Sequence, residues 1–211
     1  MINAEKVRQH TVQRLRELEV PLHPHLPFID GRLKRTPVEI AERIVGLYAM
    51  LGIGRDADPD LLWNWMEENG FLSFLSDAEM EIMQKEKFTE ANINICSWKQ
   101  ESLFVLGWFV NIESDMGLPS EESDLDELFT MIPPEVEFQT MIDSFRLKSE
   151  ESLLETLDFY YCLHAAIKHP ELWESEKQMR NVKFAAVEER RRALEWLVSA
   201  DNNWDNITLD T

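Results

Sequence analysis

The sequence contains little of what extracellular, fibrous or membrane-spanning proteins need. Its 211 residues include two cysteines, Cys96 and Cys162, which are too few for a disulfide framework. Seven glycines and nine prolines exclude a collagen-like chain, and a hydrophobic content of 44% excludes a wholly disordered one. The longest mostly apolar run, residues 103–112, is shorter than the roughly 20 residues that cross a bilayer. The start MINAEKVRQH has charges where a secretory signal peptide has an apolar run. We therefore predict a globular cytoplasmic protein without a membrane-spanning segment.

Basic side chains are also scarce, with 21 Lys and Arg against 40 Asp and Glu and a formal net charge of −19. Residues 56–145 contain 3 basic and 21 acidic side chains, whereas residues 1–55 contain 9 and 6, and residues 146–211 contain 9 and 13. The acidic middle segment repels nucleic-acid phosphates and anionic lipid headgroups, so we expect neither nucleic acid nor membrane as a partner. It has two interpretations: attraction of a basic protein partner, or solvated carboxylates that keep the protein soluble.

Signals for strands hardly appear, whereas signals for helices recur. Thr36, Pro37 and Glu39 provide an N-cap, a proline in the first turn and a capping box, and Gly52 ends the apolar stripe that follows. Similar signals predict helices or helical turns at about 1–20, 37–51, 59–69, 77–87, 90–111, 125–131, 135–145, 150–169 and 182–198. Residues 90–111 are apolar nearly all round, which is typical of a central buried helix.

We therefore predict an all-α protein, a single multi-helix domain of roughly seven to nine helices around the hydrophobic helix at 90–111. In this prediction residues 1–35 form an N-terminal helix and a proline-rich connection. Residues 36–198 form the helical body, and residues 199–211 form a C-terminal tail that docks on it.

Candidate chemistry is concentrated in the last third of the chain. Asp158, Tyr161 and His164 recur at every third residue along one side of an otherwise apolar helix, and Glu189 and Arg190 lie in the last helix. If the two helices pack together, an ion pair between Arg190 and Asp158 is geometrically reasonable. The five residues form either a structural polar network or part of a ligand-binding cleft. A general acid–base role would fall to His164 and Glu189, but no nucleophile or oxyanion donor can be named, so no catalytic residue is identified.

Other candidate motifs are weaker. His23 and His25 can face one metal ion, but further ligands do not follow at a recognisable spacing, so we predict no metal site and no cofactor. Of the three consecutive arginines 190–192, we expect only Arg190 to point into the protein, because a helix turns successive side chains onto different faces. Cys162 is interpreted as a core residue.

Several stretches match the pattern of a known family. They are Arg35 to Arg43 (RTPVEIAER), Ser97 to Leu103 (SWKQESL) leading to Leu106 and Trp108, Leu157-Asp158 with Tyr161 and His164, Glu189-Arg190 with Ala193, Leu194 and Trp196, and the ending Trp204 to Thr211 (WDNITLDT). In these stretches the chain resembles the bacterial family called domain of unknown function 4272, over nearly its whole length.

The resemblance implies a stand-alone helical bacterial protein of about this length, with no assigned activity. It also draws attention to Trp204, Asp205, Asp210 and Thr211, because a segment so near a terminus frays unless it is tied down. We expect Trp204 to dock into the helical body. We expect Asp205 to accept hydrogen bonds from Arg190 or from free backbone N–H groups.

Two functional hypotheses follow. The first is a non-enzymatic protein-interaction module whose acidic face binds a basic partner protein, with an affinity that salt weakens. The second is an enzyme or small-ligand binder with a solvent-reachable cleft near Asp158, His164, Glu189 and Arg190. The first is favoured, because no catalytic constellation is found.

Overall fold

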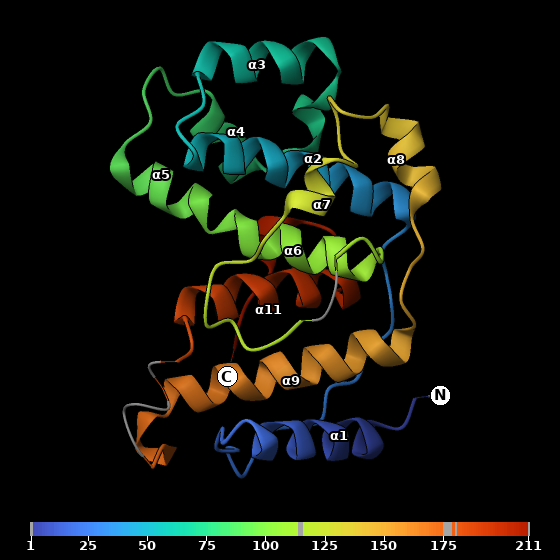
Figure 1. Cartoon of the computed structure of the whole chain (residues 1–211), viewed down its shortest axis with the longest axis vertical. Coiled ribbons are helices and arrows are strands. Elements are labelled where there is room, and N and C mark those ends of the chain that lie inside the picture. The colour runs from blue at the N-terminus through green and yellow to red at the C-terminus, as the bar shows by residue number, and fades with distance from the viewer. Residues whose placement is uncertain (1, 114–115, 175–178, 180, 211) are drawn as a thin grey trace.

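The computed structural model describes residues 2–113, 116–174, 179 and 181–210, and every regular element among them is helical (Figure 1). This confirms the predicted all-α class. The α-helices are α1 (Ala4–Glu17), α2 (Pro37–Gly54), α3 (Pro59–Glu68), α4 (Asp77–Met83), α5 (Glu90–Ser97), α6 (Lys99–Phe109), α7 (Asp126–Phe129), α8 (Phe138–Ser144), α9 (Glu150–Lys168) and α11 (Phe184–Val198). The 3₁₀ helices are η1 (Phe71–Phe74), η2 (Pro170–Leu172) and η3 (Trp204–Asn206). Among the described residues, no helix has both the length and the apolar character that crossing a membrane requires.

The helices are stacked along the long axis of the molecule (Figure 1). Helix α1 packs on α9, α9 on α11, α11 on α6, and α6 on α2, while α3 lies beyond α2 at the end opposite α1. The largest fully buried side chains come from several of these layers and include Leu15, Ile40, Leu47, Leu103, Phe109, Phe159 and Tyr160. One hydrophobic core therefore joins the first helix of the chain to the last.

The segment predicted as one central helix at 90–111 is two helices, α5 and α6, separated at Trp98. Its central position agrees with the prediction, because all 11 residues of α6 are buried and α6 packs against α2 and α11. The prediction that the segment forms one continuous helix was wrong. At the break, the last residue of α2 approaches the backbone closely, and a Cβ on Gly54 would lie 2.4 Å from the Ser97 nitrogen. Only a residue without a side chain allows two backbones to meet in this way.

Several helices begin at the predicted caps. At α2, the Thr36 hydroxyl accepts from the Glu39 nitrogen at 3.2 Å, and the Glu39 carboxylate accepts from the Thr36 nitrogen at 2.7 Å. Ser76 and Glu79 form the same reciprocal box at α4, and the Asp58 carboxylate caps α3. These starts can be read from sequence because the side chains that satisfy the first N–H groups lie within three residues of them.

The C-terminal tail lies against the helical body. Trp204 is 5% exposed and meets the ring of Trp196 on α11 edge-on, with centroids 5.7 Å apart. Arg35, which precedes α2, donates to the Trp196 carbonyl at 3.0 Å and to the Ser199 carbonyl at 2.8 Å. A single buried guanidinium thus joins the beginning of the helical body to the end of α11.

Candidate functional site

Asp158 on α9 pairs with Arg8 of α1. The Arg8 Nη2 and Nε atoms lie 2.8 and 2.9 Å from the two carboxylate oxygens, and Asp158 is 1% exposed. The predicted ion pair between Arg190 and Asp158 is therefore wrong. Asp158 lies on the side of α9 that faces α1, whereas Arg190 approaches α9 from the α11 side.

Arg190 is the centre of a buried network between α11, α9 and α6. Its Nε donates to Glu101 Oε2 at 2.7 Å, its Nη1 to the Tyr160 hydroxyl at 2.7 Å, and its Nη2 to the Ser123 hydroxyl at 2.9 Å. Burial raises the pKa of Tyr160, although the neighbouring guanidinium opposes this shift, so Tyr160 is a neutral phenol. Glu101 and Tyr160 were not predicted as partners of Arg190, because only the rotation of the packed helices brings them to it.

Arg191 also points into the protein, contrary to the prediction that one arginine of 190–192 does. Its side chain is 2% exposed, its Nη1 donates to His164 Nδ1 at 2.6 Å, and its guanidinium lies 4.7 Å from the centre of the Tyr161 ring. Burial of His164, followed by the nearby charges of Arg191 and Lys168, lowers the pKa of this imidazole to about 4. A neutral imidazole that accepts at Nδ1 carries its proton on Nε2, which fixes the tautomer.

The predicted polar ladder on α9 therefore serves two different helix pairs. Asp158 binds α1, and His164 binds α11. Six residues correspond to about 600° of helix rotation, which places the two side chains roughly 120° apart around the axis rather than on one side.

Glu189 and the tail residues have partners of their own. Glu189 Oε2 accepts from Lys99 Nζ at 3.0 Å and from the Ser102 hydroxyl at 2.8 Å. Asp205 accepts from the Ala78 nitrogen at 3.0 Å, which is one of the two kinds of donor expected for it. The Asp210 carbonyl accepts from Arg191 at 3.0 Å, and Thr211 lies outside the described residues.

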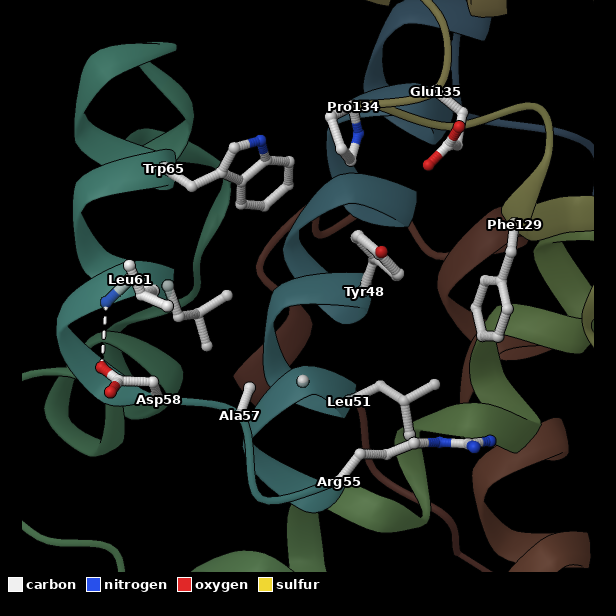
Figure 2. A pocket seen from close by; sticks show the side chains of 12 residues that line it. Tyr48, Leu51, Arg55, Ala57, Asp58, Leu61, Trp65, Phe129, Pro134 and Glu135 are labelled. Carbon is white, nitrogen blue, oxygen red and sulfur yellow. Dashed lines mark hydrogen bonds between the residues drawn. The ribbon is translucent and has the colours of Figure 1, made fainter.

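An apolar groove of about 480 Å³ lies between α2, α3 and α7, toward the end of the molecule opposite α1 (Figure 2). Its size falls within the range of about 300–1,000 Å³ that is usual for binding sites. The apolar groove is lined by Tyr48, Leu51, Gly52, Arg55, Ala57, Asp58, Leu61, Leu62, Trp65, Phe129, Pro134 and Glu135. None of the polar residues predicted as a site lines it.

Aromatic side chains from three helices form the wall of the apolar groove (Figure 2). The Tyr48 ring on α2 meets the Trp65 ring of α3 at 5.9 Å in a T-shaped contact and the Phe129 ring of α7 at 5.6 Å. Burial, with a further contribution from the negative charge of Glu135, raises the pKa of the Tyr48 hydroxyl. Rings held against one another in this way form a preformed apolar surface with a phenol among them.

The lining of the apolar groove is mostly apolar, and its charged members are mainly acidic. Leu61 on α3 is 71% exposed, although it lines the groove. The charged lining residues are Asp58 and Glu135 with one cation, Arg55, which donates to Gln100 at 2.7 Å. Exposed carboxylates flank the lining residues in sequence: Asp56, Asp60, Asp126, Glu127 and Glu137.

Apolar side chains form a stripe on α3, the helix predicted at about 59–69, and no hollow was predicted beside it. The stripe does contain Met66, which is fully buried, but Leu61 and Trp65 face the groove. The difference between buried Met66 and exposed Leu61, which lies three residues after the Asp58 cap, depends on the positions of α2 and α7. The sequence alone therefore did not reveal it.

Comparison with known families decides the classification. The model of the family described as Domain of unknown function (DUF4272) matches residues 7–207. The chain belongs to this family. In this DUF4272 chain the matched range includes both the buried polar networks and the whole lining of the apolar groove. Neither a curated protein nor a solved structure matches the chain. Within the part of the DUF4272 chain that the structure describes, no three His, Cys, Asp or Glu side chains are grouped to hold a metal ion.

Proposed function

We propose that this DUF4272 protein is a non-enzymatic protein-interaction module whose apolar groove binds one face of a basic amphipathic helix from a partner protein. The observation that carries the proposal is the position of Leu61. It is 71% exposed at the mouth of a hollow lined by Tyr48, Trp65 and Phe129. An exposed aliphatic side chain beside a preformed apolar groove is typical of surfaces that receive an amphipathic helix.

Charge supports the choice of a basic occupant. The groove is built largely from the segment 56–145, which carries 3 basic and 21 acidic side chains. Asp58 and Glu135 line it, and the exposed residues Asp56 and Asp60 flank lining residues in sequence. A helix with lysines or arginines flanking its apolar face meets complementary charge at this margin, which raises the association rate and the specificity of the contact.

The cytoplasm is the compartment that we propose for this interaction. Cys96 and Cys162 are both buried and unpaired, which is the usual state of cysteines under reducing conditions.

The experiment uses the full chain and a synthetic peptide of about 18 residues, with leucines on one helical face and lysines on the other. We expect one peptide to bind per chain in isothermal titration calorimetry, and binding to weaken roughly tenfold or more when salt is raised from about 0.05 M to about 0.5 M. Leu61→Ser should weaken binding by at least about tenfold, since burying a leucine side chain is worth about 1.5–3 kcal/mol.

The matched control is Val38→Ser, because Val38 on α2 is 46% exposed and lies outside the groove lining. A peptide of the same composition in scrambled order tests whether charge alone attracts the probe. Equal binding of the scrambled peptide, or equal effects of Leu61→Ser and Val38→Ser, would refute the proposal. A dimer of the chain that Leu61→Ser dissociates would assign the groove to a second copy instead, and it would refute the basic helix as occupant.

A further inference from the structure

A second hollow, unrelated to the apolar groove, lies on the helices at the other end of the molecule. It has a volume of about 460 Å³ and is formed mainly by α1 and α9, with residues of α6 and the segments that follow α6 and precede α9. We call it the α1/α9 pocket. The lining residues that matter for its chemistry are His10, Thr11, Arg14, Lys148, Ser152 and Glu155.

The α1/α9 pocket brings basic groups together in a chain with a net charge of −19. Arg14 and Lys148 contribute a guanidinium and an ammonium group. Among the lining residues that the structure describes, the carboxylate is that of Glu155, and it is engaged with His10, whose Nδ1 lies 2.5 Å from Glu155 Oε1. A concave site where cations meet inside an otherwise acidic protein concentrates small anions locally.

The two basic heads are held in place by the protein. The Arg14 guanidinium lies 4.0 Å from the centre of the Phe159 ring and donates to the Met116 carbonyl. Lys148 Nζ donates to Asn111 at 3.0 Å and lies 5.2 Å from the centre of the Trp108 ring. A guanidinium has five N–H donors and an ammonium has three, so each head can bond to the protein and to a bound ligand at once.

Thr11 provides an independent observation. It is 2% exposed and lines the α1/α9 pocket, and its hydroxyl has no hydrogen-bond partner in the described part of the protein. A buried hydroxyl left without a partner is costly, so proteins usually satisfy it. Because Thr11 lines the pocket, a ligand oxygen bound beside it would supply the missing acceptor, and Ser152 of α9 also lines the pocket.

We propose that the α1/α9 pocket is a binding site for a small metabolite with a phosphate or carboxylate group. In this assignment Arg14 and Lys148 bind the anionic oxygens, and the Thr11 hydroxyl donates to one of them. Charged donors and a neutral hydroxyl converging on one anion form the usual donor set of an oxyanion site. The proposal does not depend on the apolar groove.

The experiment is a titration of the isotopically labelled full chain with inorganic phosphate and, separately, with succinate, at constant ionic strength. We expect saturable changes in the amide resonances of Thr11, Gly117 and Ser152 with at least one of the two anions. If phosphate alone binds, the site takes phosphate esters, and if succinate alone binds, it takes carboxylates.

Two variants and a matched control make the test specific. Thr11→Val keeps the shape of the side chain, so it should weaken binding roughly tenfold while leaving the stability of the protein unchanged or higher. Lys148→Gln should weaken binding by a similar factor, whereas Lys87→Gln, at an exposed position outside the pocket, should not change it. The absence of saturation with both anions up to about 50 mM would overturn the proposal. So would anion affinities of Thr11→Val and Lys148→Gln that equal the affinity of the control Lys87→Gln.

Discussion

Arg190 and Glu101 form an ion pair between α11 and α6 in the interior of the protein, with Nε 2.7 Å from Oε2. The two side chains are 5% and 1% exposed. Ser123 binds both residues, since its hydroxyl accepts from Arg190 and donates to the Glu101 carboxylate at 2.8 Å. The pair is therefore fully supported by hydrogen bonds, and removal of one partner leaves the other charge buried without compensation.

We predict that Glu101→Met lowers the free energy of unfolding by about 3–5 kcal/mol, and that Arg190→Met does the same. The double variant Glu101→Met/Arg190→Met should lose clearly less than the sum of the two, because it buries no unpaired charge. Denaturant unfolding of the four proteins measures this coupling. Strict additivity of the two losses would mean that the charges do not interact.

The close approach of Gly54 to Ser97 predicts a large effect of one methyl group. Gly54→Ala should destabilise the protein by about 1–3 kcal/mol or more, since its Cβ would lie 2.4 Å from a backbone nitrogen that cannot move freely. Gly52→Ala, two residues earlier in α2, is the control. Its Cβ would meet the Leu62 methyl groups at 3.5 Å, and alanine favours a helix by up to about 1 kcal/mol over glycine. Thermal unfolding that ranks the two variants equally would contradict the packing argument.

The contacts Arg190–Glu101 and Gly54–Ser97 could not be predicted from the sequence, whereas the start of α2 could. The start of α2 depends on Thr36 and Glu39, which are three residues apart, so it could be predicted. The break at Trp98 is accompanied by the approach of Gly54, and the partner of Arg190 is Glu101, 89 residues away. Helical periodicity records which side chains are apolar, but not how each helix is rotated against its neighbours.

The candidate site was harder to predict for the same reason. Asp158, His164 and Glu189 stand out in the sequence because they are polar residues on apolar helices, and they bind three different partners. The apolar groove consists of residues such as Leu61 and Trp65, which look like core residues until the position of α2 shows that one side of α3 has no covering helix. A hollow is a property of the assembled helices.

The docked tail predicts a loss of stability when it is removed. Deletion of residues 203–211 removes Trp204 and Ile207, which are 5% and 7% exposed, from the core. We expect a loss of about 3–5 kcal/mol, as for other large-to-small changes in a core, and a thermal midpoint lower by roughly 10 °C. Trp204→Ala should reproduce most of the effect. Asp205→Asn, which weakens only the hydrogen bond to the Ala78 nitrogen, should cost about 1 kcal/mol or less. An unchanged midpoint after the deletion would show that the tail is loose in solution.

His164 predicts a specific dependence of stability on pH. Its pKa is about 4 in the folded protein, against 6.5 for an ordinary histidine, because burial and the cations Arg191 and Lys168 disfavour the charged ring. Between these two values the unfolded chain binds a proton that the folded protein does not, so this contribution to stability is complete above pH 6.5 and is lost as the pH falls toward 4. The full loss is about 3 kcal/mol.

The variant His164→Asn tests this dependence, since its side-chain oxygen can accept the hydrogen bond from Arg191 at the position of Nδ1 but cannot be protonated in this range. Denaturant unfolding at a series of pH values from 4 to 7.5 should show a smaller decrease in stability for His164→Asn than for the natural chain, by about 3 kcal/mol over the interval. Other groups titrate equally in both proteins and cancel in the difference. Parallel curves would mean that His164 has the same pKa in the folded and in the unfolded protein, and they would contradict this prediction.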